Sequence, residues 1–384
     1  MRYAMIMAGG AGTRLWPMSR KDRPKQLIRF IQRDGKGVGK EPTCLLAVAA
    51  RRLEGLIPLG NRYICTAEAY RDIVSEELPG YKDDQIVGEP EGRDTLNAIG
   101  LMAAILEKED PKAIFAVLTA DHIIEPDSVF KERMDLGFRL VEDDPRRLVT
   151  FSIKPTYAAT GFGYVERGSG IRGVEGAEKL AYHVARFVEK PDKPRAEAYF
   201  RSGEFSWNSG MFVWKAATFL EAVKKYKPES YEGLMQLREA WGKRGFKSAM
   251  EKIYPTLPKI SVDYAVMEPA AKDAQKDDGK DKKNRFSVCT VQMDVKWLDV
   301  GSWPSYAETL DADKEGNRNA GLGASVLTLC KGTTVVNAEK GHTIAVLGGE
   351  DLIVVHTKDA TLIMPKAKAE ELKKLHGLVD ERLK

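Results

Sequence analysis

Cysteine is scarce and unpaired in this sequence. Only Cys44, Cys65, Cys289 and Cys330 occur among 384 residues, with no Cys-x-x-Cys pair and no histidine nearby at ligand spacing. This pattern argues against a disulfide framework and against a zinc site. We therefore expect the protein to work in a reducing cytoplasm.

Long apolar runs and an excess of one charge are missing as well. No uncharged run approaches the roughly 18 residues that a membrane-spanning helix needs. We therefore expect that the protein is not an integral membrane protein. The N-terminal residues 1–8 contain a single basic residue, which is a poor signal peptide, and are typical of a first buried strand. Sixty Lys and Arg against 56 Asp and Glu leave a net charge of +4, too weak to indicate nucleic acid or an anionic membrane as a partner.

The composition is that of an ordinary globular protein, 43% hydrophobic and 30% charged. At about 150 residues per domain, the length predicts two to three domains. Up to about residue 265, short apolar runs alternate with helix-like segments, which predicts an α/β fold with a Rossmann-like, mixed, mostly parallel sheet flanked by helices. The expected strands are 3–7, 63–66, 113–119, 148–152 and 211–213, and the expected helices are 43–53, 69–78, 97–109 and 129–142.

The pattern changes in the last part of the chain. Residues 271–285 are almost all charged or small, which predicts a solvated loop. Short strands separated by glycines follow at 325–329, 333–337, 342–347, 352–356 and 360–364. They predict a small C-terminal β domain, for which a short left-handed β-helix is one form. After Pro365, one apolar face fits a terminal helix, formed by Leu372, Leu375, Leu378, Val379 and Leu383.

These observations place an N-terminal domain at 1–315 and a small β domain with its terminal helix at 316–384. The apolar C-terminal region has two interpretations. It mediates a homodimer, or its helix packs on its own domain.

A glycine-rich turn follows the first expected strand. It reads Ala8-Gly-Gly-Ala-Gly-Thr-Arg-Leu-Trp-Pro17, and Lys25 follows in Pro24-Lys-Gln26. Glycines let backbone N–H groups approach an anion without a Cβ in the way, so the turn is typical of phosphate binding. It is neither a Walker A loop nor a dinucleotide fingerprint, which needs a third glycine where Leu15 stands. A plain tight turn is the alternative, and Thr13, Arg14 and Lys25 argue against it.

The segment Gly9–Arg20 followed by Pro24–Gln26 resembles the signature of the sugar-1-phosphate nucleotidyltransferases. Its Leu-Trp-Pro-Met-Ser-Arg form resembles the mannose-1-phosphate guanylyltransferases among them. Further segments match the family in order: Gly88–Arg93, Ala120–His122, Gly161–Tyr164, Phe187–Pro191, Trp207–Phe212, Ser261–Glu268 and Trp297–Trp303. The resemblance implies that residues 1–315 are a nucleotide-diphospho-sugar transferase domain. The implied reaction is the Mg²⁺-dependent transfer of GMP from GTP to α-D-mannose 1-phosphate, with release of pyrophosphate.

Such a transfer needs positive charge around the triphosphate, because a sugar-phosphate oxygen attacks the α-phosphorus while pyrophosphate leaves in line. By the resemblance, Arg14 and Lys25 neutralise the departing pyrophosphate and are catalytic. Main-chain amides of the turn hold the triphosphate, at Gly9, Gly10, Gly12 and Thr13. The attacking phosphate is already ionised at neutral pH, so neither a side-chain nucleophile nor a general base is required.

Two aspartates are candidates for a magnesium site. Asp121 ends an expected buried strand and Asp299 lies in a turn after another. Carboxylate oxygens are the usual protein ligands of Mg²⁺. The resemblance assigns the metal to this pair and makes Asp121 catalytic. A helix N-cap or Asx turn is the alternative for Asp121, and His122 is expected to orient its loop.

The resemblance also implies a sugar-phosphate site at Glu189, Lys190 and Asn208, whose carboxylate, ammonium and amide suit hydroxyls and a phosphate. Gly163 would let the backbone approach the sugar ring. Asp263 lies in a family motif at the site. For Gly163 and Asp263 a purely structural role is the alternative.

The segment Glu89–Arg93 resembles the guanine-recognition segment of the family. The resemblance implies that the base is guanine and that Glu89 and Arg93 bind the nucleotide. There a carboxylate or a carbonyl would accept from the N1–H and N2–H₂ of guanine. A solvated loop is the alternative. The chain departs from the family pattern at Asp94 and Asn97, where the family has asparagine and proline, and both positions concern base contact and helix entry.

Two other functions stay open at this point. One is the same chemistry on another pair, such as UTP or ATP with glucose 1-phosphate. The other is a regulatory subunit that binds a nucleotide sugar without turnover. The complete set of Arg14, Lys25, Asp121 and Asp299 favours an enzyme. Longer family members carry an added isomerase domain, which this sequence lacks, so we expect a single activity.

Overall fold

The computed structural model describes residues 1–10, 12–33, 38–275 and 286–384. The chain forms two compact units. Unit 1 contains residues 1–9, 50–119 and 125–296, and unit 2 contains residues 10–49, 120–124 and 297–384. Ala11 of the glycine turn and residues 276–285 of the expected charged loop lie outside the described residues.

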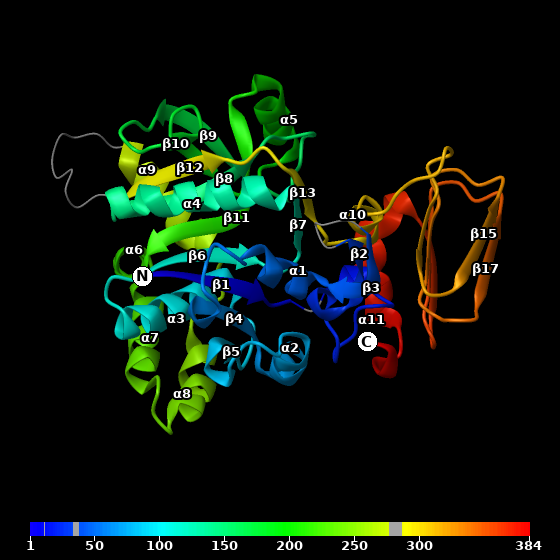
Figure 1. Cartoon of the computed structure of the whole chain (residues 1–384), viewed down its shortest axis with the longest axis horizontal. Coiled ribbons are helices and arrows are strands. Elements are labelled where there is room, and N and C mark those ends of the chain that lie inside the picture. Colours follow the sequence, from blue (N-terminus) through cyan, green and yellow to red (C-terminus); the bar gives the residue numbers. More distant parts are fainter. Residues whose placement is uncertain (11, 34–37, 276–285) are drawn as a thin grey trace. The chain divides into compact units, whose positions relative to one another are not determined.

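Unit 1 is built on a nine-stranded mixed sheet in the order β5-β4-β1-β6-β11-β8-β12-β10-β9 (Figure 1). Four neighbouring strands run parallel: β5 (Ile86–Glu89), β4 (Arg62–Ala67), β1 (Arg2–Ala8) and β6 (Ile114–Thr119). Antiparallel pairing begins at β11 (Phe205–Lys215), which joins β6 to β8 (Arg147–Ile153). The rest of the sheet is β12 (Ser287–Gln292), parallel to β8, then β10 (Ala181–Val188) and β9 (Gly163–Gly170).

Helices cover both faces of this sheet (Figure 1). Alternation along β11 separates the two sides: the Trp214 ring stacks on Phe219 at 4.5 Å, whereas Val213 faces Gly137 of α4. One face therefore packs against α4 (Asp127–Asp143). The other carries α3 (Asp94–Glu109), α6 (Ala216–Tyr226) and α7 (Pro228–Ala240), which pack on one another. The remaining helices of unit 1 are α2 (Arg71–Glu77), α5 (Lys193–Ser202), α8 (Phe246–Ile253) and α9 (Glu268–Gln275).

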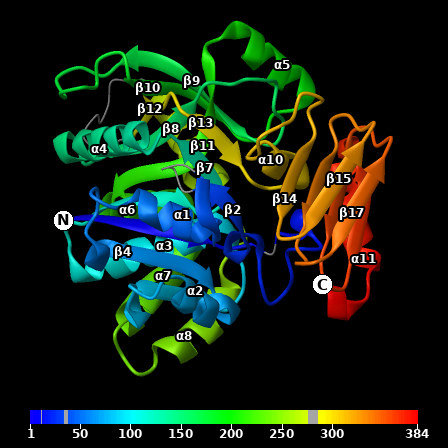
Figure 2. The ribbon, with the colours of Figure 1, turned by 45° about the vertical axis from the view of Figure 1, so that its right-hand side comes forward.

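Unit 2 contains two sets of short parallel strands near the C-terminus (Figure 2). One set is β14 (Arg318–Gly321), β16 (Thr334–Asn337) and β18 (Leu352–His356), to which β19 (Thr361–Pro365) adds an antiparallel edge. The other set is β15 (Ala324–Thr328) and β17 (Thr343–Leu347). Parallel strands this short, joined by turns, form the rungs of a β-helix.

The rest of unit 2 packs on these rungs through a core that includes Trp16, Phe30, Trp303, Tyr306 and Val355. Its elements are β2 (Arg29–Arg33) paired with β3 (Val38–Cys44), α1 (Leu45–Arg52), β7 (His122–Glu125) paired with β13 (Lys296–Asp299), and α10 (Trp303–Ala307). The first residue of β13, the last residue of β7 and the last turn of α1 belong to unit 1. Residues 10–49 thus share a core with the C-terminal residues, whereas the sequence suggested a division at 315/316, which stays a proposal.

Most expected elements are confirmed with small shifts, and three differ. The expected strand 211–213 is only part of the much longer β11, Phe205–Lys215. The expected helix 43–53 begins only at Leu45, because the two preceding residues still belong to β3. The expected terminal helix is broken into a 3₁₀ segment at Lys366–Glu371, a short α11 at Leu372–Leu378 and a second 3₁₀ turn at Glu381–Leu383. Val379 is extended, with ψ 156°, and this conformation ends α11. Of its apolar residues Leu372 is buried, whereas Leu378 is 84% exposed.

None of the helices in the described part of the chain combines the length and the apolar character needed to cross a membrane. All four cysteines are buried thiols outside any disulfide.

Candidate active site

The glycine turn shows why two of its glycines are needed. Gly10 and Gly12 have φ values of 92° and 65°, which other L-residues rarely adopt. Gly12 also has no room for a side chain, because a Cβ there would lie 2.6 Å from the Cβ of Lys25. A short 3₁₀ turn, Thr13–Leu15, follows directly. Gly10–Leu15 belong to unit 2, and Gly9 closes the first segment of unit 1.

Lys25 is bound to the first of the two candidate metal ligands. Its Nζ lies 2.5 Å from Oδ2 of Asp121, and the Lys25 side chain is 13% exposed. Burial disfavours the charged form of Asp121, but the positive charge of Lys25 and the neighbouring imidazole of His122 outweigh it and lower the pKa of Asp121 to about 2. Asp121 is therefore a carboxylate at neutral pH.

Asp121, His122 and Asp299 come together in unit 2. Each offers one ligand atom within 4.8 Å of the others. Within the described residues, Oδ1 of Asp299 is buried without a hydrogen-bond partner. Burial and the neighbouring charge of Asp121 raise the pKa of Asp299. A buried oxygen without a donor, beside a second carboxylate, fits a site for a hard divalent cation.

His122 is oriented by its neighbours. Trp297 Nε1 donates to His122 Nδ1 at 3.2 Å, and the two rings meet edge to face. Nε2 of His122 lies 3.8 Å from Oδ1 of Asp121. Because Nδ1 accepts this bond, the imidazole carries its proton on Nε2 and directs that N–H toward the carboxylate pair, which agrees with an orienting role.

Arg14 has an acidic partner that lies far away in the sequence. Its Nη1 donates to both carboxylate oxygens of Glu370, at 3.1 and 3.2 Å. The Glu370 side chain is 74% exposed. Exposed pairs of this kind contribute little to stability, so the contact holds Arg14 without fixing it.

The expected sugar-phosphate residues form one cluster in unit 1. Gly163 is paired with Asn208 across β9 and β11. A Cβ at Gly163 would lie 2.4 Å from Oε2 of Glu189 and 3.3 Å from Cβ of Asn208, so a side chain there would displace the Glu189 carboxylate. The Glu189 side chain is 6% exposed and its Oε1 accepts from Nζ of Lys190 at 2.6 Å. Lys190 itself has φ 46°, a conformation that is costly for a residue with a side chain and is typical of functional sites.

A hydrogen-bond chain orients Asn208 within this cluster. Thr150 Oγ1 donates to Oδ1 of Asn208 at 2.7 Å, and Nδ2 of Asn208 donates to Oδ1 of Asp263 at 2.9 Å. Burial and the negative charge of Glu189 raise the pKa of Asp263 to about 7. The register of β11 against β8 shifts after Asn208, so a bulge sets the direction of this side chain.

Glu89 of the base segment is buried, and both of its carboxylate oxygens accept hydrogen bonds. It is 8% exposed, and its Oε1 accepts from the Tyr254 hydroxyl at 2.5 Å. Its Oε2 accepts from Cys65 Sγ at 3.7 Å. Burial raises the pKa of Glu89. Arg93 forms an ion pair with Glu91.

The two departures from the family pattern have structural explanations. Asp94 has φ 62°, a left-handed conformation that aspartate and asparagine tolerate better than most residues. Asn97 is fully buried, and its Nδ2 donates to the carbonyls of Pro258 at 2.6 Å and of Arg93 at 3.4 Å. It therefore ties the first turn of α3 to a neighbouring loop, which proline cannot do.

Sequence reasoning missed three side chains that contact predicted site residues: Thr150 and Tyr254 in unit 1, and Glu370 in unit 2. No motif marks them, since each lies in an ordinary strand, turn or helix. His122 was named as an orienting residue, and its contacts with Trp297 and Asp121 agree with that role.

Comparison with known proteins gives a consistent result. A family model described as nucleotidyl transferase matches residues 3–316, and one described as a MannoseP isomerase/GMP-like beta-helix domain matches residues 329–378. The mannose-1-phosphate guanylyltransferase of Klebsiella pneumoniae is 35% identical over 377 residues, which are 97% of this chain and 73% of that protein. ManC of Salmonella typhimurium, also a mannose-1-phosphate guanylyltransferase, is 35% identical over 97% of this chain and 72% of its own length. A crystal structure described as mannose-1-phosphate geranyltransferase from Thermus thermophilus matches with a TM-score of 0.80 and 29% identity, over 97% of this chain and 98% of that one.

Proposed function

The chain belongs to the nucleotidyl transferase family, and we propose that it transfers GMP from GTP to α-D-mannose 1-phosphate, giving GDP-mannose and pyrophosphate. The observation that carries the proposal is the cluster of Lys25, Asp121 and Asp299 in the unit that also holds the glycine turn. That cluster combines a cation for phosphate with carboxylates for a metal, which nucleotidyl transfer needs.

In the proposed reaction an oxygen of mannose 1-phosphate forms a bond to the α-phosphorus of GTP, and the bond to the bridging oxygen of pyrophosphate breaks in line. No group of the protein takes part covalently. Main-chain amides at Gly10, Gly12 and Thr13, with Gly9, hold the triphosphate. Arg14 and Lys25 stabilise the negative charge that collects on the departing pyrophosphate. Arg14 exchanges its contact with Glu370 for the phosphates when GTP binds.

Asp121 and Asp299 are the residues that would hold Mg²⁺, with His122 beside them. A bound Mg²⁺ would neutralise phosphate charge and polarise the α-phosphoryl group. Support comes from the buried Oδ1 of Asp299, which has no hydrogen-bond donor within the described residues. It also comes from the low pKa of Asp121, which keeps that carboxylate charged.

For the sugar side, we propose that the cluster in unit 1 binds mannose 1-phosphate. Glu189 accepts hydrogen bonds from sugar hydroxyls, and Lys190 meets the phosphate. The amide of Asn208 is held in one orientation by Thr150, so it is set before the sugar arrives. Gly163 leaves the room that a sugar ring needs beside Glu189.

For the base, we propose recognition of guanine by Arg93 and by main-chain carbonyls of the segment Glu89–Arg93. The Glu89 carboxylate already accepts hydrogen bonds from Tyr254 and Cys65, so its role in the proposal is to hold the segment in place. Carbonyl oxygens accept from the N1–H and N2–H₂ of guanine, which adenine does not present in the same pattern.

A substrate matrix tests the proposal. Purified protein with Mg²⁺ is mixed with each nucleoside triphosphate and each hexose 1-phosphate, and pyrophosphate release is measured. We expect the highest kcat/KM for GTP with mannose 1-phosphate. A higher kcat/KM for another pair would show that the substrates are that pair. If no pair released pyrophosphate, the chain would instead be a regulatory subunit that binds a nucleotide sugar without turnover. Arg14→Ala should lower turnover by about a hundredfold with the fold retained, whereas Arg172→Ala, at an exposed site, should not.

We also propose that two copies associate through the C-terminal β region. Along β15 and β17 every second residue is exposed, and these residues include Val326 and Leu347. Leu347 is 75% exposed, and Ile363 on β19 is 66% exposed. Apolar side chains in such number on short strands favour burial against a partner. Light scattering after size exclusion should show a dimer that Leu347→Lys converts to monomer, and a monomeric wild type would refute this.

A further inference from the structure

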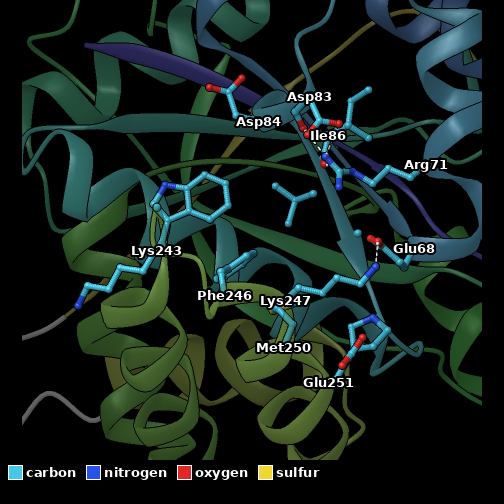
Figure 3. A pocket seen from close by; sticks show the side chains of 15 residues that line it. Glu68, Arg71, Asp83, Asp84, Ile86, Lys243, Phe246, Lys247, Met250 and Glu251 are labelled. Atoms are coloured by element: carbon cyan, nitrogen blue, oxygen red, sulfur yellow. Dashed lines mark hydrogen bonds and ion pairs between the residues drawn. The ribbon is translucent and has the colours of Figure 1, made fainter.

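Unit 1 has a pocket of about 320 Å³ that plays no part in the reaction described above (Figure 3). We call it the β5–α8 pocket. Ile86, Val87 and Gly88 of β5 line it on one side, and Phe246, Lys247, Met250 and Glu251 of α8 line it on the other. Its volume lies at the lower end of the range of small-molecule sites, about 300 to 1,000 Å³.

The inner surface of the pocket is apolar and aromatic. Val87 and Met250 are buried, at 3% and 4% exposure, and form its floor. Trp241 and Phe246 are only partly buried, and their rings meet edge to face with centroids 4.9 Å apart. In Figure 3 the Phe246 side chain lies next to that of Met250. Such walls favour a flat ring, which packs against the face of one aromatic side chain and the edge of another.

The rim of the pocket is rich in acceptors. Four carboxylates line it, Glu68, Asp83, Asp84 and Glu251, against Arg71, Lys243 and Lys247. Arg71 is committed to main-chain oxygens of Ile86 at 2.9 Å and Asp83 at 2.6 Å, and its Nη2 forms an ion pair with Oδ1 of Asp83 at 2.7 Å. The Lys243 side chain points away from the cavity in Figure 3. Lys247 lies 3.5 Å from Glu68. Arg71 and Lys247 each pair with one carboxylate and Lys243 is directed away, so Asp84 and Glu251 leave the rim with an excess of negative charge.

We infer that the β5–α8 pocket binds a planar ring whose edge carries N–H donors and no negative charge, and that its occupancy alters the binding of GTP. The ring packs between Val87, Trp241 and Phe246, and its N–H groups donate to Glu68 and Glu251. A nucleobase and an aromatic amidinium ion share this chemistry. A carboxylate or phosphate on the same ring would meet the acidic rim and be rejected.

The expected effect on GTP binding rests on the proposed function. It also rests on the chain connections by which β5 ends at Glu89 and α8 leads into Tyr254. Gly88 is followed directly by Glu89, and α8 runs directly into Tyr254. The hydroxyl of Tyr254 donates to Glu89 at 2.5 Å, so the walls of the pocket are joined by a buried hydrogen bond. A ligand that changes the spacing of β5 and α8 must change this bond, and with it the support of the segment Glu89–Arg93.

Calorimetric titration of the full chain tests the pocket. The probes are adenine and benzamidine, with benzoate as the negatively charged control, each titrated without GTP. We expect at least one of the first two to bind once per chain, and benzoate not to bind. Adenine alone would identify a nucleobase site, and benzamidine alone a site for aromatic cations.

Variants show whether the probe occupies this pocket. Glu68→Gln should weaken binding about fivefold or more, because an acceptor loses its charge. Lys247→Gln should strengthen binding, because Glu68 loses its competing partner. Lys243→Gln, on the same rim but directed away, should change little. Phe246→Ala should abolish binding. Failure of both probes, or binding that is unchanged in Glu68→Gln and Phe246→Ala, would overturn the inference.

Titration of GTP in the presence and absence of the bound probe tests the coupling. We expect the Kd of GTP to change about threefold or more, and the change to vanish in Tyr254→Phe. An unchanged Kd would overturn the coupling. The probe titrations need neither GTP nor turnover, so failure of the proposed function would leave their result intact.

Discussion

Asp263 makes folding depend on pH in a way that a single substitution removes. Its pKa is ordinarily near 4 and is raised to about 7 by burial and by Glu189. At a pH between these two pKa values, the Asp263 carboxyl is deprotonated in the unfolded chain and protonated in the folded chain. The stabilising contribution of the protonated form is therefore complete below about pH 4 and is lost as the pH rises to about 7.

The size of the effect follows from this difference. At about 1.4 kcal/mol per pH unit, the carboxyl lowers the free energy of unfolding by about 1.5 kcal/mol at pH 5 and about 4 kcal/mol at pH 8. Asp263→Asn keeps an oxygen that accepts from Asn208 and has no proton to lose. We therefore expect the variant to gain about 2 to 3 kcal/mol over the wild type between pH 5 and pH 8.

Urea unfolding at the two pH values measures this gain. Glu178→Gln, at an exposed carboxyl, is the control and should show the same pH dependence as the wild type. In a Glu189→Gln background the gain should shrink, because the charge that raises the pKa of Asp263 is gone. A gain that is equal at pH 5 and pH 8 would refute the reasoning.

Three further substitutions act on substrate binding. Gly12→Ala should lower kcat/KM for GTP at least about tenfold, because its Cβ would displace Lys25. Glu370→Gln should lower the KM for GTP a few-fold, because Arg14 then has no charged competitor for phosphate. Lys190→Ala should raise the KM for mannose 1-phosphate about tenfold and leave the KM for GTP nearly unchanged. All three are read from steady-state pyrophosphate release.

Each of these variants has a matched control. Gly60→Ala places a Cβ where nothing lies within 4 Å and should keep full activity. Glu350→Gln and Lys193→Ala change exposed charges outside the clusters and should keep the wild-type KM values. Wild-type kinetics in Gly12→Ala, a raised KM for GTP in Glu370→Gln, or an unchanged KM for the sugar phosphate in Lys190→Ala would each contradict the assigned contact.

Sequence patterns predicted the parts of the fold that local physics determines. The segment 113–119 is apolar on both faces, and its residues 114–119 form the buried strand β6, parallel to β1 and antiparallel to β11, with Phe115 and Val117 in the core. The glycine turn was predicted from residue types alone, and the φ values of Gly10 and Gly12 give the reason.

Long-range contacts set the features that the sequence did not predict. Arg14 meets Glu370 across 356 residues of chain, and no local pattern indicates that pair. Asn208 is oriented by a bulge in β11 and by Thr150 on another strand, so its role depends on register. The C-terminal apolar stripe predicted one helix, but an extended Val379 divides it, and Leu378 is left exposed.

The central claim is that Asp121 and Asp299 hold one divalent ion beside the triphosphate, and Mn²⁺ titration tests it most directly. The titration is followed by electron paramagnetic resonance with a GTP analogue that cannot be cleaved, in the wild type, Asp121→Asn, Asp299→Asn and the exposed-site control Asp294→Asn. We expect one tight site in the wild type and the control, and affinity at least about tenfold weaker in each of the other two variants. Wild-type Mn²⁺ affinity in both Asp121→Asn and Asp299→Asn would contradict the claim.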